Sequence, residues 1–228
     1  ALSLPMTESA TTAGELRARL LFDPRCIAKK REGEKIDHNI AGLVVGTLQR
    51  TAAAISKPLD LGSIQTIRAM GAGEALTTTF SPEETSLDWY RGISSWEDLE
   101  TASTESDILP DYPLVPDPPE IKHLLAVETG FRSCSFQRLA SGNWEHATFD
   151  PSVPIVTLEN VAMMMMQIDI LCKQQGYPRG RYHLRWERGG VWFWISEQEN
   201  LMLVLTPVEV TPVEIQFLTR CGDAFLLA

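Results

Sequence analysis

Histidine and cysteine are the residues of this 228-residue chain that metal binding or nucleophilic catalysis would most readily use. There are four of each, spread over separate stretches with no HExxH, HxxE or CxxC spacing that could begin a metal site. Cys134, His146 and Asp150 could lie across a hairpin as nucleophile, base and orienting acid, but no catalytic signature surrounds the cysteine. The sequence therefore predicts no catalytic residue, no metal, no cofactor, and cysteines that stay reduced in the core.

The composition predicts a globular chain with a sizeable core, since 44% of the residues are hydrophobic and 22% are charged. The formal charge of −10 argues against nucleic acid and anionic membrane surfaces as partners, because their phosphates would be repelled. The longest clean apolar run, Ile40 to Leu48, is far shorter than the roughly 20 residues that cross a bilayer. No signal-peptide pattern is found at the start. We therefore expect a cytoplasmic protein.

An acidic, proline-rich stretch divides the chain. Eight acidic residues and no Lys or Arg lie between Ser94 and Glu120, and five prolines fall within residues 110–120. Proline at this density excludes a helix interior or a central strand and favours an extended path. The pattern predicts a first domain at 1–93, a linker at 94–119 and a second domain at 120–228, with a partner-recognition segment as the alternative role for the linker.

The predicted second domain has the clearer pattern of helices and strands. Apolar residues at helical spacing, alternating stretches and Gly or Asn turns mark their bounds. Thr157 is the expected N-cap of the long helix, which Gly176 ends, and Thr211-Pro-Val-Glu214 opens the last helix with a cap, a proline and a glutamate. The predicted elements are a helix at 120–128, strands at 131–139 and 144–149, a helix at 157–175, strands at 181–187, 191–196 and 201–210, and a helix from 211.

This order predicts an α+β fold, with a five-stranded antiparallel sheet and helices covering one or both of its faces. It resembles the roadblock, or dynein light chain, superfamily, whose profilin-like sheet occurs in bacterial partners of Ras-like small GTPases. The resemblance covers about residues 120–228 and rests on element order and hydrophobic pattern. It implies a non-catalytic interaction module or scaffold.

The first half repeats part of this plan. Asn39-Ile-Ala41 aligns with Asn160-Val-Ala162, and an apolar run follows in both. Alternating residues and a glycine turn come next in each half, and Gly71-Ala-Gly73 lacks the Lys-Ser/Thr of a phosphate-binding loop, so we expect a hairpin turn there. We predict an internal duplication, with a chance match as the alternative. The first copy is expected to be degenerate, because residues 83–92 supply no clear fifth strand.

A row of four methionines in the 157–175 helix would fan over about 300° of its circumference. Such a helix is covered on two sides, and the resemblance implies contact with its own sheet and with the equivalent helix of a second copy. Gly42 and Gly46 are expected to let the helices approach closely. Single-domain packing and a promiscuous Met-rich surface are the alternatives. The predicted interface residues of the two helices, which could also mediate self-association, are Met163, Met164, Met165, Met166, Leu43, Val44 and Val45.

The strand at 191–196 is apolar on both faces, with Trp192 and Trp194 on one face and Phe193 on the other. A strand of this kind is covered on two sides or exposes an aromatic patch. Aromatic residues are enriched at protein interfaces, so we predict Trp192 and Trp194 as contact residues, with core packing under a helix as the alternative.

Two classes of function are open on this basis. The first is a roadblock-like regulator or scaffold that binds a protein partner, a Ras-like small GTPase being the partner that the resemblance implies. The second is a small-molecule sensor or enzyme that uses a ligand pocket on a profilin-like sheet. The missing acid–base and metal constellations favour the first.

Overall fold

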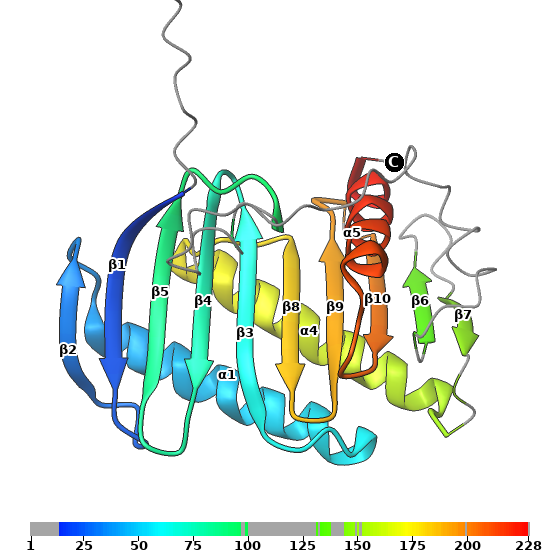
Figure 1. Cartoon of the computed structure of the whole chain (residues 1–228), viewed down its shortest axis with the longest axis horizontal. Coiled ribbons are helices and arrows are strands. Elements are labelled where there is room, and N and C mark those ends of the chain that lie inside the picture. The colour runs from blue at the N-terminus through cyan, green and yellow to red at the C-terminus, as the bar shows by residue number, and fades with distance from the viewer. Residues whose placement is uncertain are drawn as a thin grey trace, which may run out of the picture.

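The structure, a computed structural model of the whole chain, is an α+β fold with one large antiparallel sheet (Figure 1). It describes residues 14–96, 99, 131, 133–137, 144–148, 150, 152–198 and 200–227. Most of the predicted linker at 94–119 and the predicted helix at 120–128 lie outside the described residues. Trp96 and Leu99, at the start of that linker, are buried. The elements are β1 (Glu15–Phe22), β2 (Ala28–Gly33), α1 (His38–Leu59), β3 (Ile64–Gly71), β4 (Glu74–Phe80), β5 (Thr85–Arg91), β6 (Ser133–Gln137), β7 (Trp144–Thr148), α4 (Ile155–Gln175), β8 (Arg181–Trp186), β9 (Gly189–Ile195), β10 (Leu201–Thr206) and α5 (Pro212–Leu227).

The sheet has ten strands in the order β2-β1-β5-β4-β3-β8-β9-β10-β6-β7, so the expected size of five strands was wrong. The two halves join because β3 pairs antiparallel with β8, with Ile67 opposite Leu184 at the middle of the ladder. A sheet of five strands would leave each of these strands at an edge, with its backbone N–H and C=O groups unpaired. The pairing between β3 and β8 satisfies both edges at once.

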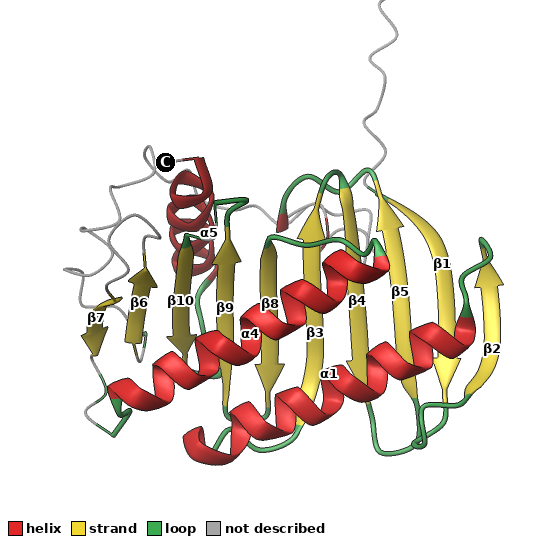
Figure 2. Ribbon diagram, turned by 180° about the vertical axis from the view of Figure 1, so that it is seen from behind, coloured by secondary structure: helices red, strands yellow, loops and turns green. Residues whose placement is uncertain are grey.

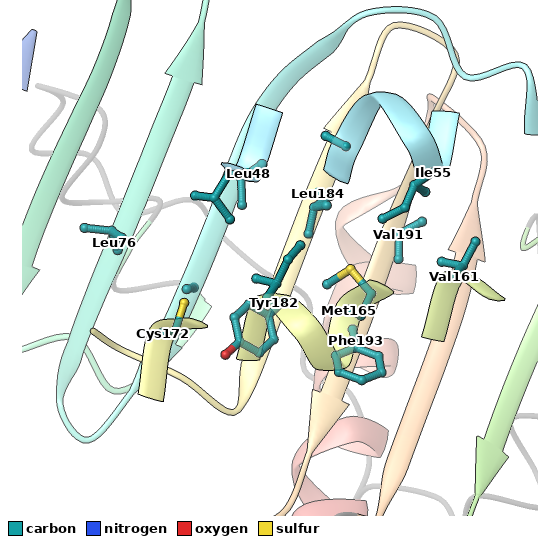
Figure 3. Packing of buried hydrophobic residues seen from close by; sticks show 14 of the residues in the cluster. Leu48, Ile55, Leu76, Val161, Met165, Cys172, Tyr182, Leu184, Val191 and Phe193 are labelled. Atoms are coloured by element: carbon teal, nitrogen blue, oxygen red, sulfur yellow. The ribbon is translucent and has the colours of Figure 1, made fainter. Parts of the chain in front are cut away.

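Helices lie on both faces of this sheet. Figure 2 shows α1 and α4 running side by side in opposite directions across one face, and α5 lies on the other face over β9 and β10 (Figure 1). The core between the sheet and the α1–α4 layer contains residues of both halves of the chain. In Figure 3, Met165 and Val161 of α4 and Ile55 of α1 gather over Val191 and Phe193 of β9.

The helix ends follow from specific capping residues. Asp37 caps α1, because its carboxylate accepts hydrogen bonds from the backbone N–H groups of Asn39 and Ile40. At α5, Thr211 and Glu214 bond reciprocally as the sequence predicts. The prediction of Thr157 as the N-cap of α4 was wrong. The N-cap is Pro154, three residues earlier, and it offers no side-chain acceptor.

Strand β5 occupies residues 85–91, where no clear strand was predicted, so the expectation that the first half lacks a fifth strand was wrong. The signal was hidden by Asp88, a residue type that strands disfavour. In the structure the Asp88 carboxylate accepts hydrogen bonds of 2.6 and 3.2 Å from Arg19 on the neighbouring strand β1. The charge is thereby paired within the sheet.

Among the described residues, α4 is the one helix long and apolar enough to cross a membrane by length and composition, and this was missed in the sequence. Leu158, Val161, Met165 and Ile168 of this helix are buried in the core between the sheet and the α1–α4 layer. Its apolar character is therefore used in packing, as in the core helix of a soluble domain.

The difference between the two helix starts can be tested by substitution. Asp37→Ala removes the acceptor of two backbone N–H groups and should destabilise the protein by about 1 kcal/mol. Thr157→Ala is the matched control, because Thr157 does not cap α4, and should have little effect. Urea unfolding of both variants gives the two free energies of unfolding. Equal losses would contradict the assigned caps.

Candidate functional site

The α1–α4 layer contains seven of the predicted interface residues, and the structure divides them into buried and exposed groups. Val44, Val45 and Met165 are buried, with Met165 0% exposed. Leu43 and Met163 face solvent, with 68% and 56% of their surface exposed. The remaining two, Met164 and Met166, are partly buried and pack against the same core.

The division of the methionine row follows from helix geometry. Four successive side chains point in four directions, and α4 is covered by the sheet below and by α1 beside it. Only the outer direction is left to solvent, and Met163 occupies it. The expectation that the whole methionine row is covered was therefore too broad, because Met163 faces solvent, whereas α4 does contact both the sheet and α1.

A stripe of exposed apolar residues runs along the outer side of α4. Val156, Met163 and Ile170 are each more than half exposed, and their seven-residue spacing places them on one side of the helix. On α1, Ile40 and Leu43 are exposed at a spacing of three. Of these residues, only Met163 and Leu43 were predicted to lie at an interface. The heptad spacing of the α4 residues was the signal that could have identified the rest.

The small residues of α1 have a different role from the one expected. A side chain at Gly42 would place its Cβ atom 2.5 Å from the carbonyl oxygen of Cys26, and the nearest atom to a Cβ at Gly46 would be Cys26 Sγ. Gly42 therefore makes room for the loop between β1 and β2, whereas a Cβ at Gly46 would meet Cys26 Sγ at an ordinary contact distance of 3.5 Å. None of the atoms nearest to either position belongs to α4.

Trp192 and Trp194 are not exposed contact residues, so this prediction was wrong. Both are buried on the face of the sheet that α5 covers, with Trp194 0% exposed. A Cβ atom at Gly222 of α5 would lie 2.0 Å from Trp194 Cε2, so glycine is what allows the helix to sit on the indole. Trp96 covers Trp192 edge-on at 5.3 Å between ring centroids. The structure instead shows the alternative interpretation, in which both side chains belong to a core under a helix.

A buried ionic group fixes the C-terminal part of α4. Asp169 is 2% exposed. Its carboxylate accepts hydrogen bonds of 2.6 to 3.2 Å from the Arg179 guanidinium and one of 2.5 Å from the Tyr182 hydroxyl. The hydrogen bonds to Asp169 raise the pKa of Arg179, and burial raises the pKa of Tyr182 well above its ordinary value. The group therefore holds α4 to the loop before β8 and to β8 itself.

Contacts between the two halves fix both helices over the joined sheet. The Trp186 indole N–H of β8 donates a 3.2 Å hydrogen bond to the carbonyl oxygen of Ala52 in α1. At the other end of the layer, Trp89 of β5 packs edge-on against Tyr177, which follows α4, with 5.2 Å between ring centroids. Each long helix thus contacts strands or loops of the other half.

The described residues offer no metal-binding cluster, and two of their thiols are poorly suited to act as nucleophiles. No cluster of three His, Cys, Asp or Glu side chains suited to a metal occurs in this part of the chain. Burial raises the pKa of both Cys172 and Cys221 to about 12, so these thiols are protonated and poor nucleophiles at neutral pH. For the possible triad of Cys134, His146 and Asp150, the structure describes only how the two strands pair. Cys134 lies opposite Ala147 and Ser135 lies opposite His146. The side chains of Cys134 and His146 lie outside the described set.

Comparison of the chain with family models, curated proteins and solved structures found no match.

The ionic group at Asp169 is testable by mutation. Asp169→Asn removes the buried charged partner of Arg179 and leaves only the exposed Glu197, so it should destabilise the protein by about 3 kcal/mol. Glu197→Gln is the control, because Glu197 pairs with the same arginine at 3.1 Å from an exposed position, and should cost less than about 1 kcal/mol. Chemical denaturation measures both. Similar losses for the two variants would argue against a special role for the buried carboxylate.

Proposed function

We propose that the chain is a roadblock-like, non-catalytic interaction protein in which two copies of one plan are joined in a single polypeptide. In this proposal the α1–α4 layer binds a protein partner, a Ras-like small GTPase, in the cytoplasm. The protein acts by burying apolar surface against the partner and so favouring one conformation of the partner's switch loops.

The strand order is the observation that carries this proposal. Strands β1–β5 and β6–β10 can be treated as two sets of five. From each edge of the sheet to its centre, the strands of a set follow the same order, which is second, first, fifth, fourth and third. In each set the long helix lies between the second and third strands. The two long helices lie antiparallel on one face (Figure 2). An arrangement of this kind is what a dimer with a twofold axis would have. The aligned Asn39 and Asn160 segments lie in these two helices, Asn39 in the first turn of α1 and Asn160 in the second turn of α4.

The surface of the α1–α4 layer supports a protein partner. Exposed apolar residues on a packed, rigid helix can bury area without a large loss of conformational entropy. Met163 adds a flexible side chain that adapts to the shape of a partner. No other described element has three exposed large apolar residues on one side, as α4 has in Val156, Met163 and Ile170.

A binding experiment with the full chain tests the proposal. The immobilised protein is exposed to extract of the source cells supplemented with GDP or with a non-hydrolysable GTP analogue, and the captured proteins are identified by mass spectrometry. We expect a Ras-like GTPase that prefers one nucleotide state. Binding of that purified GTPase should weaken at least about tenfold in the double variant Met163→Asp, Ile170→Asp, because two charges would be buried in an apolar contact.

The control variant is Val208→Asp. Val208 is also an exposed apolar residue, but it lies on the loop between β10 and α5, on the other side of the sheet. It should bind the GTPase as the unmodified chain does. Capture of no GTPase, or equal weakening by the double variant and the control, would refute the proposed function.

A further inference from the structure

A cavity of about 510 Å³ lies on the sheet face opposite α1 and α4, at the junction of β3 and β8. Thr66 and Arg68 of β3 and His183 and Arg185 of β8 line it. The residues that alternate with them, such as Ile67 and Leu184, belong to the core under the α1–α4 layer. The cavity is therefore built from the polar side of the strand pair that joins the two halves.

The strand register brings positive charge to both sides of this junction. Arg68 lies opposite His183 and Thr66 lies opposite Arg185, on either side of the central pair of Ile67 and Leu184. The only acidic lining residue among those described is the exposed Glu209. Burial, and then the charges of Arg68 and Arg185, lower the pKa of His183 well below its ordinary value, so the imidazole is neutral. The site is locally positive in a chain whose formal charge is −10.

Two of these side chains have unused hydrogen-bonding capacity. Arg185 is exposed and forms no hydrogen bond or ion pair with another described residue. His183 stacks on Trp192 at 3.9 Å between ring centroids, and its buried Nδ1 atom has no hydrogen-bond partner in the described part of the chain. A buried polar atom without a partner is costly and uncommon. It is the kind of group that a bound ligand, directly or through water, satisfies.

Apart from Thr206 and Glu209, the side chains of the remaining lining are apolar. Val208 and Val210 of the loop after β10, Ile215 of α5 and the indole of Trp96 contribute to it. The volume falls within the range of pockets that hold small organic ligands, which combine a largely apolar lining with a few convergent polar groups. A molecule that fits both parts has an anionic head and an apolar body.

We propose that this cavity binds an organic anion whose carboxylate or phosphate group pairs with Arg185 beside His183 and whose apolar part contacts Val208 and Ile215. The planar guanidinium of arginine matches both kinds of oxyanion with paired N–H donors. The site is separate from the outer surface of α1 and α4, so this inference does not depend on the proposed function.

The test uses the full chain and three probes with the same apolar body, below their micellar concentrations: octanoate, octyl phosphate and octan-1-ol. Binding is followed by the intrinsic fluorescence of tryptophan, since Trp96 and Trp192 line the cavity, and by the shift of the melting temperature. We expect at least one of the two anions to bind at least about tenfold more tightly than the alcohol. The tighter anion identifies the head group.

Arg185→Gln should weaken binding of the preferred anion at least about tenfold, and Arg185→Lys should restore part of it. Arg31→Gln is the matched control, because it removes the same charge from an exposed position on β2. It should bind as the unmodified chain does. Equal binding of the alcohol and the anions, binding that Arg185→Gln leaves unchanged, or binding of none of the three probes would overturn the proposal.

Discussion

The antiparallel pairing of β3 with β8 is the interaction on which the rest of the structure depends. It converts two sets of strands into one sheet and provides a surface wide enough for α1 and α4 to lie side by side. Ile67 and Leu184 sit opposite each other at its centre and belong to the core that both helices cover. Without this pairing, each half would present a long edge strand with apolar side chains, which is a site for association with other chains.

Because the sheet is covered on both faces, its central strands are apolar on both sides. Every residue of β9 and β10 is buried, and the two faces of β9 contribute to two different cores. Trp192 and Trp194 belong to the core under α5, while Phe193 belongs to the core under α4. One face of the β3–β8 pair is an exception, because it has the polar side chains of Arg68 and Arg185. Helix α5 does not fill the space over this face, and the cavity lies there.

The sequence predicted the class of fold and the described elements of the second half well, because each has a strong local signal. The alternation in residues 181–186 and the Thr211 and Glu214 pair are examples. It could not predict the pairing of β3 with β8, which depends on contacts between distant segments, and β5 was hidden by an aspartate whose partner is on another strand. For the candidate site, the methionine row indicated that the long helix is covered on more than one side, as α4 is. Which methionine faces solvent depends on the covering of α4 by α1 and the sheet, which periodicity alone does not give.

The proposed duplication has a consequence for the number of partners that bind. A symmetric dimer presents two equivalent copies of any surface, whereas two copies within one chain are free to diverge. With Asn39 matched to Asn160, the α1 positions equivalent to Met163 and Ile170 are Gly42, which is buried, and Gln49, which is polar. The exposed apolar stripe therefore exists on α4 and has no equivalent on α1. Within the described part of the chain there is one such stripe, so under the proposed function one partner molecule would bind each chain through it.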